Sequence, residues 1–180
     1  KISSGATSGI VIDNISLSNS YYGIAVVSGN DLNNYYIGQS GGNANIGKVT
    51  ISNIMGAPMY RGIMIKGISS AVEMSNLQFN YSCYVSSHVS MRMQSAIDVE
   101  ISNSQNVSID NMLTFGAYSG ITTKPAYSSR RVNLKATNLN LEGQKAISLL
   151  SSGNYDIYNS YFFMVNFAEA AVQNEFRGIE

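Results

Sequence analysis

The stretch Val49-Thr50-Ile51-Ser52-Asn53, followed by Ile54, decides the fold because the chain repeats it in altered form. The pattern is two apolar residues one position apart, a small or polar residue, Asn, and usually another apolar residue. It recurs, more loosely in the last two copies, with the asparagine at Asn14, Asn53, Asn76, Asn111, Asn138 and Asn159. Such repetition is the signature of repeat architectures. Asn tolerates the left-handed backbone of a sharp bend, so each copy predicts a strand, a tight corner and a second strand.

A second repeated phrase is a small residue followed by an alternating apolar strand. It begins at Gly23, Gly62, Ala96, Gly120 and Ala146, and a third short strand is expected after each Asn corner. Period-two alternation places one face of every strand inside and the other outside. The sequence therefore predicts an all-β coil, or solenoid, with three short strands per rung. Its continuous core should include the corner residues Ile51, Ile54, Met74, Leu77, Ile109 and Met112.

Length and composition limit the domain count and the classes of partner. The 180 residues suit a single domain over residues 1–180, which we expect to be a piece of a longer protein because the repeat is under way by Ile10. With zero net charge and 12% charged residues, the chain has no field to attract nucleic acid. No apolar run is long enough to predict membrane insertion. The single Cys83 and the single His88 show no zinc-ligand spacing, so no metal or cofactor is expected.

Two long interruptions of the repeat are candidate binding elements. Val27–Lys48 is rich in Asn and Gly and carries Tyr35 and Tyr36, whose flat rings suit the faces of sugars, although a floppy loop would have the same composition. Asn80–Ser95 is predicted to be an ordered loop that carries the side chains Tyr84, His88 and Arg92. The alternative for the histidine is an ordinary hydrogen-bonded surface group.

The strand Ala96–Ser102 holds the leading catalytic candidates. If its apolar residues point into the coil, Asp98 and Glu100 both point outward, roughly 6.5–7 Å apart along the strand. Two carboxylates on one rigid face are what acid–base hydrolysis of a glycosidic bond requires, and this spacing is closer to the inverting than to the retaining range. The alternative is a pair of ordinary solvated residues.

The rungs V-x-I-x-N-[IL] and G-I-x-[IV] resemble the right-handed, single-stranded parallel β-helix of the pectate-lyase-like superfamily, and most of all the tailspike polysaccharide depolymerases of bacteriophages. The resemblance covers nearly the whole chain. It implies that the small-residue strands form the first sheet, whose outer face carries the substrate groove in many members. It also implies a parallel homotrimer on a virion tail, or at the bacterial surface or secreted if the source is not a phage. Outward residues expected at subunit contacts are Met55, Met59, Tyr60, Phe115 and Tyr118.

In this arrangement the two interruptions rise from opposite edges of the first sheet, with Asp98 and Glu100 between them. The basic loop Lys124–Arg131 leaves the same sheet one rung later and adds Lys124, Tyr127 and Arg130. Because rungs are about 4.8 Å apart, all of these elements fall within a few rungs. A groove with aromatic walls, a carboxylate floor and a basic margin fits an acidic polysaccharide.

Three functions are therefore expected as alternatives. The first is an enzyme that cleaves a capsular or O-antigen polysaccharide, by hydrolysis or by lyase chemistry in which a base removes the proton beside a uronate carboxylate. The second is a non-catalytic sugar-binding adhesin, and the third is a purely structural shaft. The candidate catalytic residues are Asp98, Glu100 and His88, and the candidate substrate-binding residues are Tyr35, Tyr36, Tyr84, Arg92, Lys124, Tyr127 and Arg130.

Overall fold

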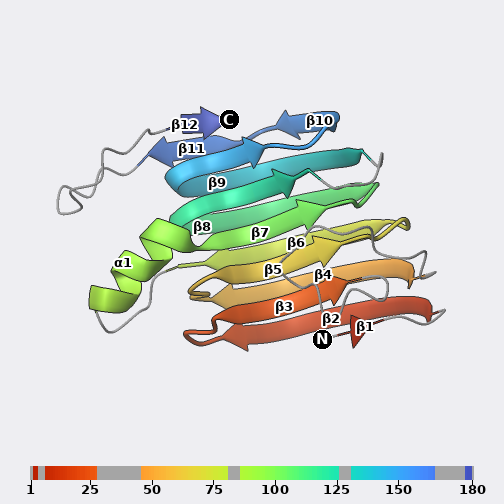
Figure 1. The fold of residues 1–180 in the computed structure, drawn as a ribbon, viewed down its shortest axis with the longest axis horizontal. Coiled ribbons are helices and arrows are strands. Elements are labelled where there is room, and N and C mark those ends of the chain that lie inside the picture. Colours follow the sequence, from red (N-terminus) through yellow and green to blue (C-terminus); the bar gives the residue numbers. More distant parts are fainter. Residues whose placement is uncertain are drawn as a thin grey trace.

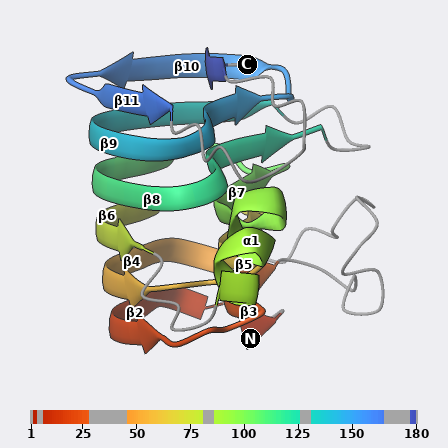
Figure 2. The same ribbon diagram turned by 90° about the vertical axis from the view of Figure 1, so that its left-hand side faces the viewer.

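The computed structural model describes residues 2–3, 7–27, 46–80, 86–125, 131–164 and 177–179. Parallel β-strands curve around a common axis and stack along it, with a single described helix on one side (Figures 1 and 2). The elements are β1 (Ile2–Ser3), β2 (Thr7–Leu17), β3 (Tyr22–Val27), β4 (Ile46–Gly56), β5 (Arg61–Lys66), β6 (Val72–Phe79), α1 (Ser86–Ser95), β7 (Ile97–Ser102), β8 (Val107–Lys124), β9 (Val132–Leu149), β10 (Gly153–Tyr158), β11 (Tyr161–Met164) and β12 (Arg177–Ile179).

Each turn of the chain pairs in parallel with the turn that follows it. The strand order β1-β3-β5-β7-β8-β6-β4-β2 closes most of the way around the axis, and β9 continues the stack by pairing with β8 and with β10, β11 and β12. The register keeps equivalent residues aligned, as in Ile24↔Ile63↔Val99↔Ile121↔Ile147. The predicted all-β, solenoid-like organisation is therefore confirmed at the level of a coiled parallel sheet.

The asparagine corners have the backbone conformation that the sequence predicts. Their φ angles are 59° at Asn14, 54° at Asn53, 54° at Asn76, 57° at Asn111, 55° at Asn138 and 50° at Asn159. This left-handed region is strained for most residues, but a short polar side chain that forms local hydrogen bonds reduces the cost. The bend is tight enough that β2, β4, β6, β8 and β9 each run through their asparagine without interruption.

The glycines that begin three copies of the second repeated phrase are required by close packing between turns. An added Cβ at Gly23 would lie 2.5 Å from the carbonyl oxygen of Gly62, and one at Gly62 would lie 2.5 Å from the carbonyl oxygen of Asp98. A side chain at these positions would force the backbones of neighbouring turns apart. The interior beyond them is the predicted continuous core, in which all six predicted corner residues are at most 2% exposed: Ile51, Ile54, Met74, Leu77, Ile109 and Met112.

The prediction that Asn80–Ser95 is entirely loop is wrong, because Ser86–Ser95 forms helix α1. The segment contains neither Gly nor Pro, and Met91, Arg92 and Met93 all have high helix propensity. The helix packs against β8. Within α1, the side chains of Arg92 and Met93 are buried, whereas the side chain of Met91 is exposed. An insertion that looks irregular in sequence therefore covers one side of the coil.

Candidate functional site

Asp98, the first catalytic candidate, is bound by an arginine from α1 in the interior of the protein. The Arg92 guanidinium binds both carboxylate oxygens, with Nη1–Oδ1 at 2.7 Å and Nη2–Oδ2 at 2.9 Å. Both side chains are fully buried. Arg92 also donates to the carbonyl oxygens of Pro58, at 2.8 Å, and of Phe115, at 3.4 Å. The expectation that Asp98 is exposed is wrong because α1 and its arginine cover it.

This environment makes Asp98 a structural group rather than an accessible acid or base. Burial raises the pKa of the Asp98 carboxyl, and the Arg92 guanidinium opposes that rise by favouring the charged form. Neither oxygen has a position open to solvent, so in this arrangement no substrate reaches Asp98. Arg92, which was predicted to bind substrate, is equally closed to solvent in this arrangement. Breaking a buried, bidentate pair of this kind is strongly unfavourable, which fixes α1 on the coil.

Glu100, the second catalytic candidate, lies between two cations from neighbouring turns. Its Oε2 accepts a hydrogen bond from Arg61 Nε at 2.5 Å and lies 2.9 Å from Lys124 Nζ. The Arg61 and Glu100 side chains are only 9% exposed, and Lys124 is 39% exposed. Glu100 is therefore not the solvent-facing carboxylate that the strand pattern predicts. Glu100 and Lys124 are brought together as predicted, but as an ion pair, and their partner Arg61 was missed.

The structure tests no catalytic or binding role, and the side chains of the other predicted site residues lie outside its described part. The backbone of His88 lies in α1, but its side chain is outside the described part of the chain. Also outside it are Tyr35, Tyr36, Tyr84, Tyr127 and Arg130, together with Cys83. Among the described residues, no group of three or more His, Cys, Asp and Glu side chains is placed to hold a metal ion. Within the same residues, no helix has the length and apolar character needed to cross a membrane.

A stack of tyrosines, which the sequence reasoning missed as a site, lies where the chain enters β3 and β5. The rings of Tyr21 and Tyr60 stack with their centroids 4.8 Å apart and 10° between their planes, and Tyr22 meets both edge-on. Tyr21 is 54% exposed. The guanidinium carbon of Arg61 lies 3.7 Å from the centroid of Tyr60. We call Tyr21 and Tyr60 the tyrosine platform.

The sequence carried a signal for this platform. Tyr21 and Tyr60 each stand two residues before a glycine of the second repeated phrase, Gly23 and Gly62, so the register that aligns the glycines also aligns the rings. Of the residues expected at subunit contacts, Tyr60 belongs to this platform. Met55 is 51% exposed, as expected of a contact residue, but the expectation that Met59 is exposed is wrong, because Met59 is buried.

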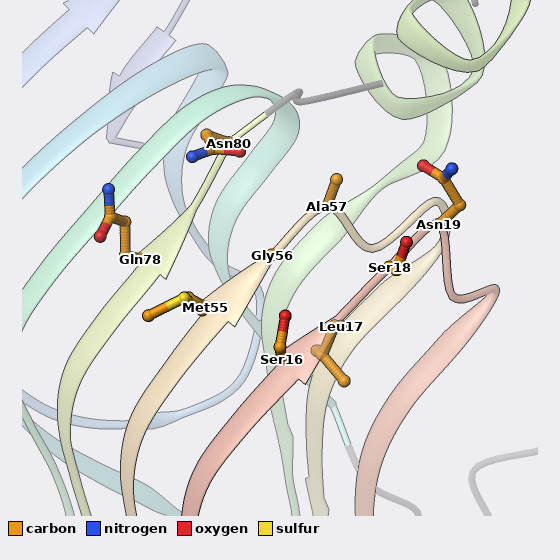
Figure 3. Close-up of a pocket in the computed structure, with 9 residues that line it drawn as sticks. All are labelled: Ser16, Leu17, Ser18, Asn19, Met55, Gly56, Ala57, Gln78 and Asn80. Carbon is orange, nitrogen blue, oxygen red and sulfur yellow. The ribbon is translucent and has the colours of Figure 1, made fainter. Parts of the chain in front are cut away.

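A small polar pocket opens on the outer surface of β2, β4 and β6 (Figure 3), and its lining residue Asn19 stands two residues before Tyr21 in the chain. Its volume is about 210 Å³. The connections that lead from it to Tyr21 and Tyr60 run side by side, since Ala57 N donates to Leu17 O at 2.9 Å and Arg61 N donates to Tyr21 O at 3.1 Å. The lining residues are Ser16, Leu17, Ser18, Asn19, Met55, Gly56, Ala57, Gln78 and Asn80.

The comparisons with known proteins identify no relative of this chain. Neither models of protein families, nor curated proteins, nor solved structures give a match to this chain. The resemblance to phage tailspikes therefore rests on the rung pattern, and the structure adds to it a parallel, solenoid-like β-fold.

Proposed function

We propose that this chain is part of a tailspike-like protein that binds a bacterial surface polysaccharide, capsular or O-antigen, on the outside of its coil. The finer architecture proposed with it is the right-handed, single-stranded β-helix of the pectate-lyase-like superfamily, in a homotrimer on a virion tail. The observation that carries the binding function is the exposed tyrosine platform, together with the polar pocket. Tyrosine combines a flat apolar face with a polar tip, which matches the apolar faces and hydroxyl edges of sugar rings.

The platform is fixed before any ligand arrives. Tyr60 is held between contacts with Tyr21 and with the Arg61 guanidinium. Arg61 is in turn held by Glu100 and by the carbonyl oxygens of Tyr60, at 2.7 Å, and of Ser95, at 3.1 Å. A surface that needs no rearrangement binds with a smaller entropy cost. The ion pair around Glu100 thus supports binding by positioning an aromatic ring.

The same ion pairs favour binding over cleavage by these carboxylates. Hydrolysis of a glycosidic bond needs one carboxyl group to give a proton and a second to activate water or to attack the sugar. Asp98 is occupied on both oxygens and buried, and Glu100 is neutralised by two cations. The proposal is therefore retention of the polysaccharide without cleavage at this pair.

The test is retention of purified capsular and O-antigen polysaccharides on a biosensor by the wild-type protein, Tyr21→Ala and the matched control Tyr158→Ala. Tyr158 is also exposed but lies on β10, away from the platform. We expect Tyr21→Ala to weaken binding about tenfold or more, as the loss of an aromatic anchor does, and Tyr158→Ala to bind like wild type. Retention of no polysaccharide, or equal binding by the two variants, would overturn the proposal.

A second measurement on the same polysaccharides separates binding from cleavage. Products are assayed for new reducing ends, which report hydrolysis, and for unsaturated ultraviolet-absorbing ends, which report lyase chemistry. We expect neither. If products form and Asp98→Asn or Glu100→Gln lowers turnover by about two to four orders of magnitude, as removal of a general acid or base does, while circular dichroism shows the variant as folded as wild type, the non-catalytic part of the proposal is wrong.

A further inference from the structure

We infer that the pocket on β2, β4 and β6 is a subsite for one uncharged sugar ring, and that it selects neutral over acidic units of the bound glycan. The inference rests on the proposed function and adds the chemical class of the unit that the site takes. It stands on three features of the pocket, which are the groups that line it, the absence of charge in its described lining, and its size and position.

The polar groups of the pocket are of the kind that recognises hydroxyl and acetamido substituents. Ser16 and Ser18 contribute hydroxyls, and amide side chains come from Asn19, Gln78 and Asn80. Each of these groups can both donate and accept a hydrogen bond, as a sugar hydroxyl or an N-acetyl group requires. The exposed Met55 supplies apolar surface for the C–H face of a ring, and Figure 3 shows its side chain between those of Ser16 and Gln78.

No charged side chain of the described residues lines the pocket. The basic groups on the neighbouring side of the coil are engaged elsewhere. Arg61 and Lys124 bind Glu100, and Arg92 binds Asp98. A uronate or sialate carboxylate in the pocket would therefore lose water without gaining a cationic partner, which is costly. A neutral ring meets no such penalty.

The size and position of the pocket fit one ring of a chain that continues onto the platform. A volume of about 210 Å³ is below the range of roughly 300–1,000 Å³ that holds a drug-sized ligand. Ser16, Met55 and Gln78 form one outward row across three successive turns, in the register Ser16↔Met55↔Gln78. With strands about 4.8 Å apart, this row is about 9.6 Å long, enough to contact one sugar ring together with its substituents. The adjacent unit of the glycan then stacks on Tyr21.

The test uses single sugars, so that it does not depend on knowing the polysaccharide. Saturation-transfer NMR is recorded with glucose, N-acetylglucosamine and glucuronate on the wild-type protein, Gln78→Ala, Gln78→Lys and the matched control Asn140→Ala. Gln78 is exposed, so its substitution leaves the core intact, and equal thermal unfolding of all variants confirms this. Asn140 is an exposed amide in the same outward row, two turns away, through the register Gln78↔Leu113↔Asn140.

We expect glucose or N-acetylglucosamine to give a signal that Gln78→Ala lowers roughly five- to tenfold, the loss typical of one hydrogen bond. Asn140→Ala should leave that signal unchanged. Glucuronate should bind weakly to wild type and more strongly to Gln78→Lys, which adds the missing cation. Stronger binding of glucuronate than of the neutral sugars by wild type, or equal effects of Gln78→Ala and Asn140→Ala, would overturn the inference.

The outcomes also separate this inference from the proposed function. Retention of polysaccharide with no effect of Gln78→Ala on either ligand refutes the subsite and leaves the platform. A neutral-sugar signal that depends on Gln78, without retention of any polysaccharide, supports the subsite and refutes the proposed polysaccharide binding. The absence of both signals refutes both.

Discussion

The Asn-corner side of the coil and the side covered by α1 are held together in opposite ways. At the corners, side chains of successive turns form exposed hydrogen bonds, such as Asn76 Nδ2 to Asn53 Oδ1 at 3.1 Å. On the α1 side, one buried guanidinium from Arg92 joins Asp98, Pro58 and Phe115, which come from three different turns. The corners distribute stability over many weak contacts, whereas the α1 side concentrates it in two buried ion pairs, Arg92–Asp98 and Arg61–Glu100.

The largest effect is expected from Asp98→Ala, which leaves Arg92 buried without its partner. The free energy of unfolding should fall by about 3–5 kcal/mol, measured by urea denaturation. The control is the double variant Arg92→Met with Asp98→Leu, which should lose much less because no unpaired charge remains buried. A loss below about 1 kcal/mol in the single variant would show that the α1 side does not depend on this pair.

The core between the two sides should be nearly as sensitive. Ile51→Ala removes a fully buried side chain and should lower the free energy of unfolding by about 2–5 kcal/mol. Val11→Ala on β2, where the side chain is 77% exposed, is the control and should change it by no more than about 0.5 kcal/mol. Similar losses in the two variants would contradict the assignment of the inner and outer faces.

Substitution of a corner asparagine should lower the free energy of unfolding by less than either of these changes. Asn76 has a φ of 54°, and alanine in that conformation is disfavoured by about 1–2 kcal/mol. Asn76→Gly accommodates the φ angle but loses the same hydrogen bonds to Asn53 and from Asn111. The difference between the unfolding free energies of the two variants therefore isolates the backbone strain. If Asn76→Gly were the more destabilised of the two, the strain argument would fail.

The smallest effect is a contribution of the corners to the dependence of stability on acid pH. Hydrogen bonds from Ser52 and then Asn53 lower the pKa of Asp13, and those from Thr137 and then Asn138 lower the pKa of Asp110. A carboxyl whose pKa is lower in the folded state adds stability above its unfolded pKa, and this stability is lost as the pH falls through the folded pKa.

Unfolding free energies measured between about pH 6 and pH 2 test this dependence, since an unperturbed aspartate titrates near pH 3.9. The double variant Asp13→Asn with Asp110→Asn should lose stability less steeply on acidification than wild type. Asp156→Asn, which removes an exposed aspartate of β10 away from the corners, is the control variant. Identical curves for all three proteins would show that the two corner carboxylates make no net contribution.

The comparison also explains what the sequence could predict. The corners were predictable because the left-handed asparagine and the period-two alternation are local properties, repeated from Asn14 to Asn159. The burial of Asp98 was not predictable in this way. Alternation gives the direction of a side chain relative to its own sheet, but it does not show that an insertion such as α1 covers that side chain. The tyrosine platform was predictable only in part. Its residues repeat with the glycines, but their stacking becomes visible only once the register is known.

The fixed length of the Asn corner has a consequence for how such a chain can diversify. At all six corners the chain turns on a single asparagine, whereas residues 28–45 separate β3 from β4 and only residues 67–71 separate β5 from β6. Insertions and deletions at the other connections therefore leave the pitch of the stack unchanged. Recombination or loop grafting can exchange these connections as modules, and a new ligand specificity then requires no new scaffold.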